Sequence, residues 1–200
     1  MKGYIQVSLK DMLNEVGEDK VKSILSSFFC PLNKDVEYFL KSKAIEFARQ
    51  NIAPTHLVFT SFKDKIVLIG YFTLTTKTFS IKSGVLSSSL RKRINKFATY
   101  NADLKAHLMP APLIAQLGKN NTYSNLITGD ELLKMAIDKV AVAQSDIGGK
   151  VVYLECEDKE KLTTFYSRNG FVSFGKRELD RDETDKMDGK YLIQMLKYVG

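Results

Sequence analysis

The sequence contains no tryptophan, two cysteines, two histidines and four prolines among its 200 residues. Cys30 and Cys156 lie far apart and form no Cys-x-x-Cys motif, and His56 and His107 are isolated. A zinc site needs several such ligands at short, regular spacings. The composition therefore argues against a metal site, and the free cysteines are expected to fill the core or the surface.

Long hydrophobic runs are also missing. No stretch approaches the ~20 apolar residues that cross a bilayer. Residues 1–13 have too short an apolar run and too many polar residues for a secretory signal. With only two cysteines there is no disulfide framework of the kind found in small secreted proteins. We therefore expect a soluble, cytoplasmic protein with no membrane contact.

The length and composition are those of one globular domain. Hydrophobic residues make up 44% of the 200 residues, enough to bury a core without metal or disulfide help. No internal repeat or long linker divides the sequence, so we expect a single domain over residues 1–200. The net charge of +7 favours contact with RNA or a phosphorylated cofactor, although such a lysine excess is common in proteins that bind neither.

The first half of the sequence predicts a helix and a hairpin followed by a basic insertion. Residues 35–50 space apolar side chains three and four apart, which is typical of one amphipathic helix. Residues 56–62 and 65–76 are rich in β-branched and aromatic side chains and predict a hairpin. Residues 77–107 form the insertion. Its basic residues could belong to a solvated helix and loop or to a binding surface. Its basic residues, opposed only by Asp103, include Lys82, Arg91, Lys92, Arg93, Lys96 and Lys105.

A strand, a loop and a helix are predicted next. Residues 110–118 form a short apolar run typical of a buried strand, and an Asn-rich loop follows at 119–126. Thr128 precedes Glu131 by three residues, as in a capping box, and helical spacing then continues to a stop at residues 148–149.

The C-terminal part predicts a strand, a helix and two further strands. Residues 150–157 are a continuous apolar strand, and Asp158 is expected to cap a helix that ends at Gly170. A strand begins at residue 171. Residues 176–190 are too highly charged to pack and predict a loop before the final strand.

The most specific pattern is a strand followed by a helix ending in F-Y-x-x-x-G-F within residues 153–175. This arrangement resembles the C-terminal half of a GNAT acetyltransferase. Residues 28–40, 70–74 and 110–118 add a similarity to the tRNA-acetylating toxin branch, so the resemblance covers roughly residues 28–175. It implies an α+β fold with a mixed, largely antiparallel sheet of about six or seven strands and helices on both faces. The motif residues are Phe165, Tyr166, Gly170 and Phe171.

The resemblance implies an N-acetyltransferase that moves an acetyl group directly from acetyl-CoA to an amine. The departing thiolate benefits from a proton donor, and the resemblance gives that role to Tyr166. The alternative is a tyrosine that only packs, with its hydroxyl at the surface. Glu155 is a weaker candidate, for the general base; a solvated glutamate is the alternative, because spacing does not fix its direction. An α-amine, as on aminoacyl-tRNA, would need little help because it titrates near ~8.

The resemblance also places the cofactor along residues 117–129. Only one glycine of the family's Q/R-x-x-G-x-G/A loop remains, and Asp130 and Glu131 in the first helical turn would repel a pyrophosphate. Backbone amides can bind phosphate whatever the side chain, so a binding loop is still expected. The pantetheine arm would pair with Leu117, Gly118 and Lys119, and the pyrophosphate would meet Ser124, Asn125, Leu126, Ile127, Thr128 and Gly129.

The sequence leaves several functions open. The acceptor amine could belong to aminoacyl-tRNA, a protein or a polyamine, and the basic segment favours a phosphate-rich acceptor. The degenerate loop leaves room for a catalytically eroded GNAT-like module that only binds or regulates. A third alternative is a nucleic-acid-binding protein without acyl chemistry. Assembly into a homodimer is left open.

Overall fold

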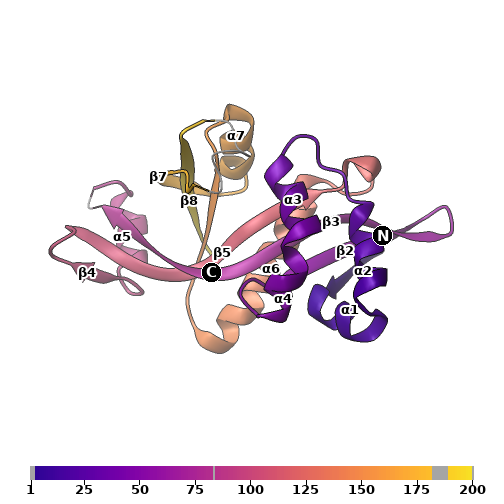
Figure 1. Ribbon diagram of the computed structural model, residues 1–200. Coiled ribbons are helices and arrows are strands. Elements are labelled where there is room, and N and C mark those ends of the chain that lie inside the picture. Colours follow the sequence, from indigo (N-terminus) through magenta and orange to yellow (C-terminus); the bar gives the residue numbers. More distant parts are fainter. Residues whose placement is uncertain (1–2, 83, 182–188, 200) are drawn as a thin grey trace. The chain divides into compact units, whose positions relative to one another are not determined.

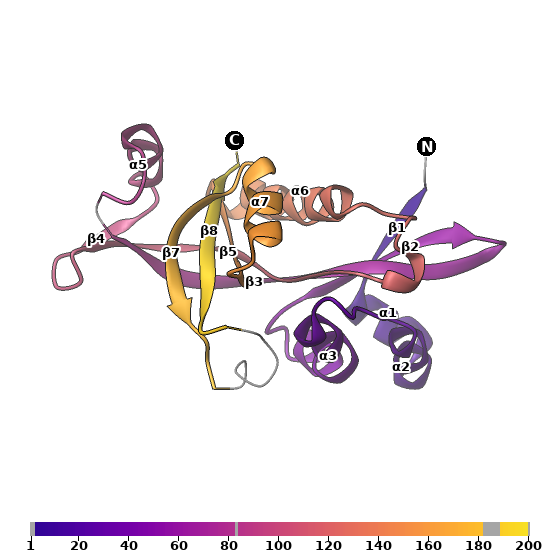
Figure 2. The same cartoon turned by 90° about the horizontal axis from the view of Figure 1, so that it is seen from above.

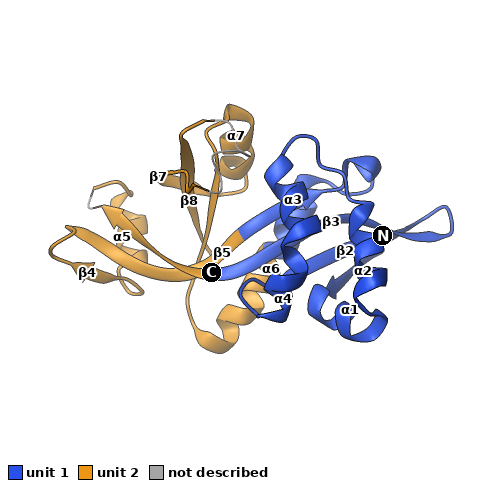
Figure 3. Cartoon of the chain, in the orientation of Figure 1, with its two compact units in different colours: residues 1–75, 115–136 blue, residues 76–114, 137–200 orange. Residues whose placement is uncertain are grey.

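The computed structural model describes residues 3–82, 84–181 and 189–199. The chain forms two compact units, residues 1–75 with 115–136 (unit 1) and residues 76–114 with 137–200 (unit 2) (Figure 3). Three elements contribute to both units, namely β3 (Lys65–Lys82), β5 (Ala106–Lys119) and α6 (Gly129–Ile147). The single domain expected over residues 1–200 stays a prediction.

Eight strands in the described residues follow the hydrogen-bonded order β1-β2-β3-β5-β6-β8-β7, with β4 paired to β5. Leu113 and Ile114 of β5 pair in parallel with Tyr153 and Leu154 of β6, whereas β1–β2, β2–β3, β4–β5, β6–β8 and β7–β8 are antiparallel. The expected mixed, largely antiparallel α+β fold is thus confirmed, with one strand beyond our upper count. The remaining strands are β1 (Tyr4–Ser8), β2 (Thr55–Phe62), β4 (Thr99–Asn101), β6 (Val151–Glu157), β7 (Val172–Glu178) and β8 (Tyr191–Tyr198).

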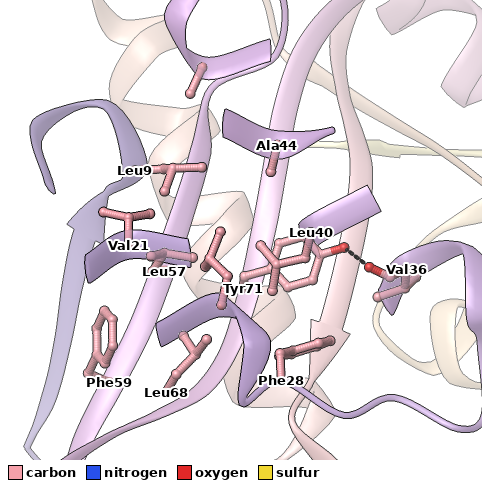
Figure 4. Close-up of a cluster of buried hydrophobic side chains, with 12 residues drawn as sticks. Leu9, Val21, Phe28, Val36, Leu40, Ala44, Leu57, Phe59, Leu68 and Tyr71 are labelled. Atoms are coloured by element: carbon pink, nitrogen blue, oxygen red, sulfur yellow. Dashed lines mark hydrogen bonds between the residues drawn. The ribbon is translucent and has the colours of Figure 1, made fainter. Parts of the chain in front are cut away.

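In unit 1, helices cover both faces of the strands. Figures 1 and 2 show α1 (Leu9–Val16), α2 (Glu18–Ser26), α3 (Lys34–Ser42) and α4 (Ala44–Arg49) on one face and the start of α6 on the other. A core forms under the first four helices, where the buried Tyr71 hydroxyl donates to the Val36 carbonyl at 2.6 Å (Figure 4). Burying such apolar side chains is the main force that holds these helices to the sheet. The largest buried members are Phe28, Tyr71, Leu9, Leu25, Leu40 and Leu57.

The helix expected over residues 35–50 is in fact two helices, so that prediction is wrong. Lys43, between α3 and α4, has φ −119°, outside the helical range. The apolar spacing continues across this break, because both helices bury residues at helical intervals, and therefore hides it. Asn33 caps α3 by accepting from the Val36 N–H at 3.1 Å. The N-terminal elements β1, α1 and α2 were not predicted.

The expected hairpin is confirmed, with Lys63 (φ 49°) and Asp64 (φ 60°) as its two turn residues. Positive φ at both positions is the geometry of a type I′ turn, whose twist matches that of the strands. Strand β3 continues to Lys82, so the segment 77–107 begins inside a strand rather than after it.

Unit 2 has its own aromatic core. The Phe79 ring lies 4.4 Å from that of Tyr153 and 5.1 Å from that of Phe174, centroid to centroid. The segment 77–107 adds α5 (Ser88–Ile94), whose buried Ile94 belongs to the same cluster. Because Phe79 and Ile94 are buried in this core, the basic segment is packed against unit 2 and is not only a solvated loop.

Two predictions for unit 2 need correction, and one is confirmed. Residues 176–178 belong to β7, because their backbone pairs with β8 while alternate side chains face solvent; residues 182–188 of the expected loop lie outside the described residues. Asp158 does not cap α7 (Glu160–Arg168): Lys159 holds the N-cap position, and Asp158 pairs with Lys176 at 2.7 Å. Gly170 (φ 83°) follows the helix end as expected.

Nowhere in the described residues is a helix both long and apolar enough to cross a membrane.

Replacing Gly118 by alanine should destabilise unit 1. The added Cβ would lie 2.4 Å from Cγ1 of Val36, 3.0 Å from Cε1 of Tyr71 and 3.1 Å from Cζ of Phe28. Such overpacking typically costs about 1–3 kcal/mol in the free energy of unfolding, measurable by urea denaturation. Gly3→Ala is the control, because a Cβ there meets nothing within 4 Å. Equal stability of the two variants would contradict the close packing.

Candidate active site

Tyr166 lies on α7 in unit 2, between two aromatic neighbours. Its ring centroid is 4.9 Å from that of Phe165 and 5.8 Å from that of Phe171. Burial raises the pKa of Tyr166 well above its usual value, and the nearby Cys156 raises it further. The hydroxyl has no hydrogen-bond partner in the described residues. The side chain as a whole is partly exposed.

The F-Y-x-x-x-G-F motif fixes this tyrosine through the helix end. The Phe171 N–H donates to the Tyr166 carbonyl at 3.1 Å, and the Asn169 side chain donates to the Phe165 carbonyl at 2.9 Å. Gly170 supplies the positive φ that lets the chain turn back, a position where glycine is strongly favoured. Buried Phe171 then packs against the Tyr166 ring, so the motif orients the hydroxyl.

Glu155 lies on β6 at the centre of a polar cluster. Its carboxylate accepts from Arg177 at 2.8 and 2.9 Å, from Gln194 at 3.2 Å and from the Tyr153 hydroxyl, and Lys77 lies 3.6 Å away. The side chain is 9% exposed. Burial alone would raise the pKa of Glu155, but the bonds from Arg177 and Tyr153 and the charge of Lys77 hold it below its usual value. A lowered pKa makes this carboxylate a weaker proton acceptor.

Tyr166 and Glu155 are not brought together. Cys156, which acts on the pKa of Tyr166, follows Glu155 directly in β6. Consecutive residues of a strand point to opposite faces of the sheet. Tyr166 therefore faces the Cys156 side of β6, and Glu155 faces the other side, toward Lys77 and Arg177.

The predicted cofactor segment begins in unit 1 with the last residues of β5. Gly118 is buried against the core, and Leu117 and Lys119 are partly buried on either side of it. The Lys119 ammonium donates to the Ser124 carbonyl at 2.9 Å, which ties the end of β5 to the following loop. Asn125 is exposed.

Asn120 anchors the start of this loop and was not predicted. Its side chain is fully buried and makes four hydrogen bonds. Oδ1 accepts from the N–H groups of Phe29 (3.2 Å) and Thr122 (3.1 Å). Nδ2 donates to the carbonyls of Ser27 (3.2 Å) and Leu68 (2.9 Å). The sequence offered no signal for it, because a buried asparagine and an exposed one look alike in an Asn-rich loop.

The capping box at the start of α6 is confirmed. The Thr128 hydroxyl accepts from the Glu131 N–H at 3.1 Å, and Glu131 accepts from the Thr128 N–H and hydroxyl, both at 2.7 Å. The box uses the amides of Thr128 and Glu131 and leaves those of Gly129 and Asp130 outside it.

Tyr4 of β1 holds the same glutamate from the other side. Its hydroxyl lies 3.0 Å from Oε1 of Glu131 and 3.1 Å from the Leu126 carbonyl. Burial and the neighbouring Glu131 raise the pKa of Tyr4 to about 12, so this hydroxyl stays protonated and can donate. Tyr4 lies in the strand that the sequence analysis missed. Together with buried Ile127, it fixes the second half of the loop.

No cluster of three or more His, Cys, Asp or Glu residues in the described ranges could hold a metal ion. The predicted groups thus form two local sites, Tyr166 in unit 2 and residues 117–129 in unit 1. Unit 2 also carries the separate cluster around Glu155.

Solved structures with the same fold include bacterial toxins. AtaT complexed with acetyl-methionyl-tRNAfMet is 18% identical, with 96% of this chain and 94% of that chain covered and a TM-score of 0.63. A tyrosine-to-phenylalanine mutant of KacT is 17% identical over 96% of this chain and 94% of that chain, also with a TM-score of 0.63. AtaTR bound with AcCoA is 17% identical over 95% and 91%, with a TM-score of 0.57.

This similarity covers nearly all of the chain and shows that it shares the fold of AtaT and KacT, as the GNAT resemblance implied. No protein-family model matches the sequence, and no curated protein does.

Replacing Glu155 by glutamine should lower stability in a pH-dependent way. Because the pKa of Glu155 is depressed in the folded protein, its charge stabilises the fold above the unfolded value of about 4.3. This stabilisation is lost as the pH falls through the lower, folded pKa. At pH 7 we expect Glu155→Gln to cost roughly 1–3 kcal/mol in the free energy of unfolding, by urea denaturation.

The loss should begin to shrink as the pH falls below about 4.3, where the unfolded state protonates, and should vanish only below the lower pKa of the folded state. Exposed Glu178→Gln is the control and should have little effect at either pH. A Glu155→Gln loss that is the same at pH 7 and pH 3 would contradict a charge-based role.

Proposed function

We propose that this protein is an acetyl-CoA-dependent N-acetyltransferase that moves an acetyl group directly to an amine, with Tyr166 as the general acid. The observation that carries the proposal is the state of the Tyr166 hydroxyl. Its ring is packed between two aromatic rings on a partly exposed side chain, and the hydroxyl has no hydrogen-bond partner in the described residues. In a purely structural buried tyrosine such as Tyr71, the hydroxyl instead donates a hydrogen bond to a backbone carbonyl.

The chemistry follows from that hydroxyl. When the amine attacks the thioester carbonyl, the carbon–sulfur bond breaks and negative charge develops on sulfur. The raised pKa of Tyr166 keeps its proton in place at neutral pH, so the hydroxyl can donate to the sulfur as the charge develops. The proton that the amine loses balances the one that the thiolate gains.

Residues 117–129 are the proposed cofactor site. Residues 117–119 end β5 beside this loop, and the Gly129 amide is not used by the capping box. The charge of Glu131 is directed at Thr128 and Tyr4, which lessens its repulsion of a phosphate. AtaTR, which shares this fold, has been solved with AcCoA bound.

A dedicated general base is not essential to the proposal. Glu155 stays our prediction for that role, but its engaged carboxylate and lowered pKa weaken it as a base. An α-amine titrates near ~8, so a useful fraction is unprotonated at neutral pH without assistance. The amine of an aminoacyl-tRNA meets this requirement.

We propose aminoacyl-tRNA as the acceptor because the positive charge is concentrated in one segment. Residues 77–107 hold seven Lys and Arg residues and one Asp, and so carry six of the chain's seven net positive charges. Arg91, Lys92, Lys96 and Lys105 are exposed, beside a Tyr100 that is 54% exposed. Cations with an exposed aromatic suit a nucleic acid and not a cationic polyamine. AtaT has been solved with acetyl-methionyl-tRNAfMet.

A catalytically eroded binding module is the second candidate, and the single glycine left in the loop favours it. Calorimetry with acetyl-CoA, followed by detection of free thiol, separates the two. Binding with thiol release supports the enzyme, whereas no binding supports the module.

Tyr166→Phe should abolish most of the turnover and leave acetyl-CoA affinity unchanged. The substitution keeps the ring contacts with Phe165 and Phe171 and removes only the proton donor. General acids typically contribute a factor of about 10²–10⁴, which a thiol-release assay with an aminoacyl-tRNA acceptor would measure as a fall in kcat. Tyr191→Phe, at an exposed tyrosine of β8 outside the basic segment, is the matched control. Parental turnover by Tyr166→Phe would show that Tyr166 only packs.

Neutralising the basic segment should weaken RNA binding and its dependence on salt. Each lost phosphate contact reduces the slope of log K against log[salt] by about 0.7–0.9. Lys92→Gln with Lys96→Gln should therefore lower the slope by up to about 1.4–1.8, measured by fluorescence anisotropy with tRNA. Lys10→Gln with Lys20→Gln, exposed in unit 1, is the charge-matched control. Equal effects of the two double variants would show that only net charge matters.

A further inference from the structure

Two surface segments that are distant in the sequence are joined beside the proposed cofactor site. The first is the connector, residues 27–33, between α2 and α3; the second is the cofactor loop, residues 120–128. The Phe29 N–H donates to Oδ1 of Asn120 at 3.2 Å, and the Asn121 N–H donates to the Phe29 carbonyl at 2.7 Å. Phe29 is therefore held on both its backbone groups by consecutive residues of the loop.

Asn120 makes this junction a single hydrogen-bonded unit. Its side-chain amide also donates to the Ser27 and Leu68 carbonyls and accepts from the Thr122 N–H. Its backbone N–H donates to the Ile69 carbonyl at 2.8 Å. The side chain is 0% exposed. A buried amide whose donors and acceptor are all engaged is costly to disturb, because any lost partner leaves a buried polar group unpaired.

The connector presents apolar side chains to solvent next to that junction. Phe29 is 48% exposed and Leu32 is 80% exposed, whereas the neighbouring Phe28 is fully buried. The Cys30 N–H is held by Glu37 at 2.7 Å, and Asn33 begins α3, so the connector is fixed at both ends. Order in this connector therefore depends on its contacts with the loop, α2 and α3.

We infer that Asn120 is the positioning residue that couples the cofactor loop to the connector, so that acetyl-CoA bound at the loop orders residues 27–33. The inference rests on the proposed function. Asn120 then has two roles. Its hydrogen bonds hold the loop amides in place for the pyrophosphate, and when the bound cofactor restrains the loop, the same bonds restrain Phe29. Phe29 and Leu32 then form a surface whose order reports whether the cofactor is bound.

Hydrogen–deuterium exchange on the unmodified protein tests the coupling directly. Acetyl-CoA should slow exchange in the peptide covering 120–128 and also, by about threefold or more, in the peptide covering 27–33, because the two share backbone hydrogen bonds. Protection of the loop without any protection of the connector would overturn the inference. If acetyl-CoA does not bind to the protein at all, both the proposed function and this inference are wrong.

Asn120→Asp separates positioning from mere support of the fold. The aspartate keeps Oδ1 but loses the Nδ2 donors and places a charge in a buried site, which raises its pKa and lets it protonate in mildly acidic solution. Acetyl-CoA affinity, by calorimetry, should fall about tenfold or more at pH 8 and recover toward the parental value near pH 5.5. The matched control is Asn14→Asp, which adds the same charge at an exposed position of α1 outside the proposed cofactor site and should change affinity by less than about twofold at either pH.

Cys30 supplies a second measurement on the same variants. It is partly buried in the connector, and with Cys156 replaced by alanine it is the one thiol in the chain. Acetyl-CoA should slow its modification by a disulfide reagent in the parent and in Asn14→Asp, but not in Asn120→Asp at pH 8. Equal slowing in all three, or equal affinity losses for both aspartate variants, would show that Asn120 does not couple the segments.

Discussion

The structure of unit 1 depends on how closely β5 approaches the core at Gly118. With a Cβ at this position, Val36, Tyr71 and Phe28 would all be in steric conflict, so the packing there leaves no spare volume. Those three residues belong to α3, β3 and the connector that follows α2, and the Tyr71 hydroxyl adds a hydrogen bond to Val36. The absence of a Cβ at Gly118 thus permits the close packing of the helices on the sheet. It also fixes the position at which β5 ends and the following loop begins.

The loop itself is held by polar contacts at three points, each from a different element. Asn120 binds the connector and β3, Lys119 binds the Ser124 carbonyl, and Tyr4 of β1 binds Leu126 and Glu131. A backbone that is fixed before a ligand arrives loses little entropy on binding. This preorganisation offers a physical reason why a loop with a single glycine could still serve as an anion site.

Charge is unevenly distributed between the parts of the chain. The segment 77–107 holds nearly all of the net positive charge, whereas the Glu155 carboxylate of unit 2 is paired at short range with Lys77 and Arg177. Charges that are balanced at short range contribute to stability and little to long-range attraction. The basic segment is therefore the feature that would steer a polyanion, and the Glu155 cluster is one that stabilises β6, β7 and β8.

The sequence by itself determined what depends on local physics. The turn at Lys63-Asp64, the Thr128–Glu131 capping box and the helix end at Gly170 were predicted because each depends on neighbours within a few residues. The motif around Tyr166 was instead found through its resemblance to GNAT acetyltransferases. Tertiary structure alone decided the burial of Asn120 and the direction of Glu155. These depend on residues tens of positions away, such as Leu68, Ser27 and Arg177, which no local pattern brings together.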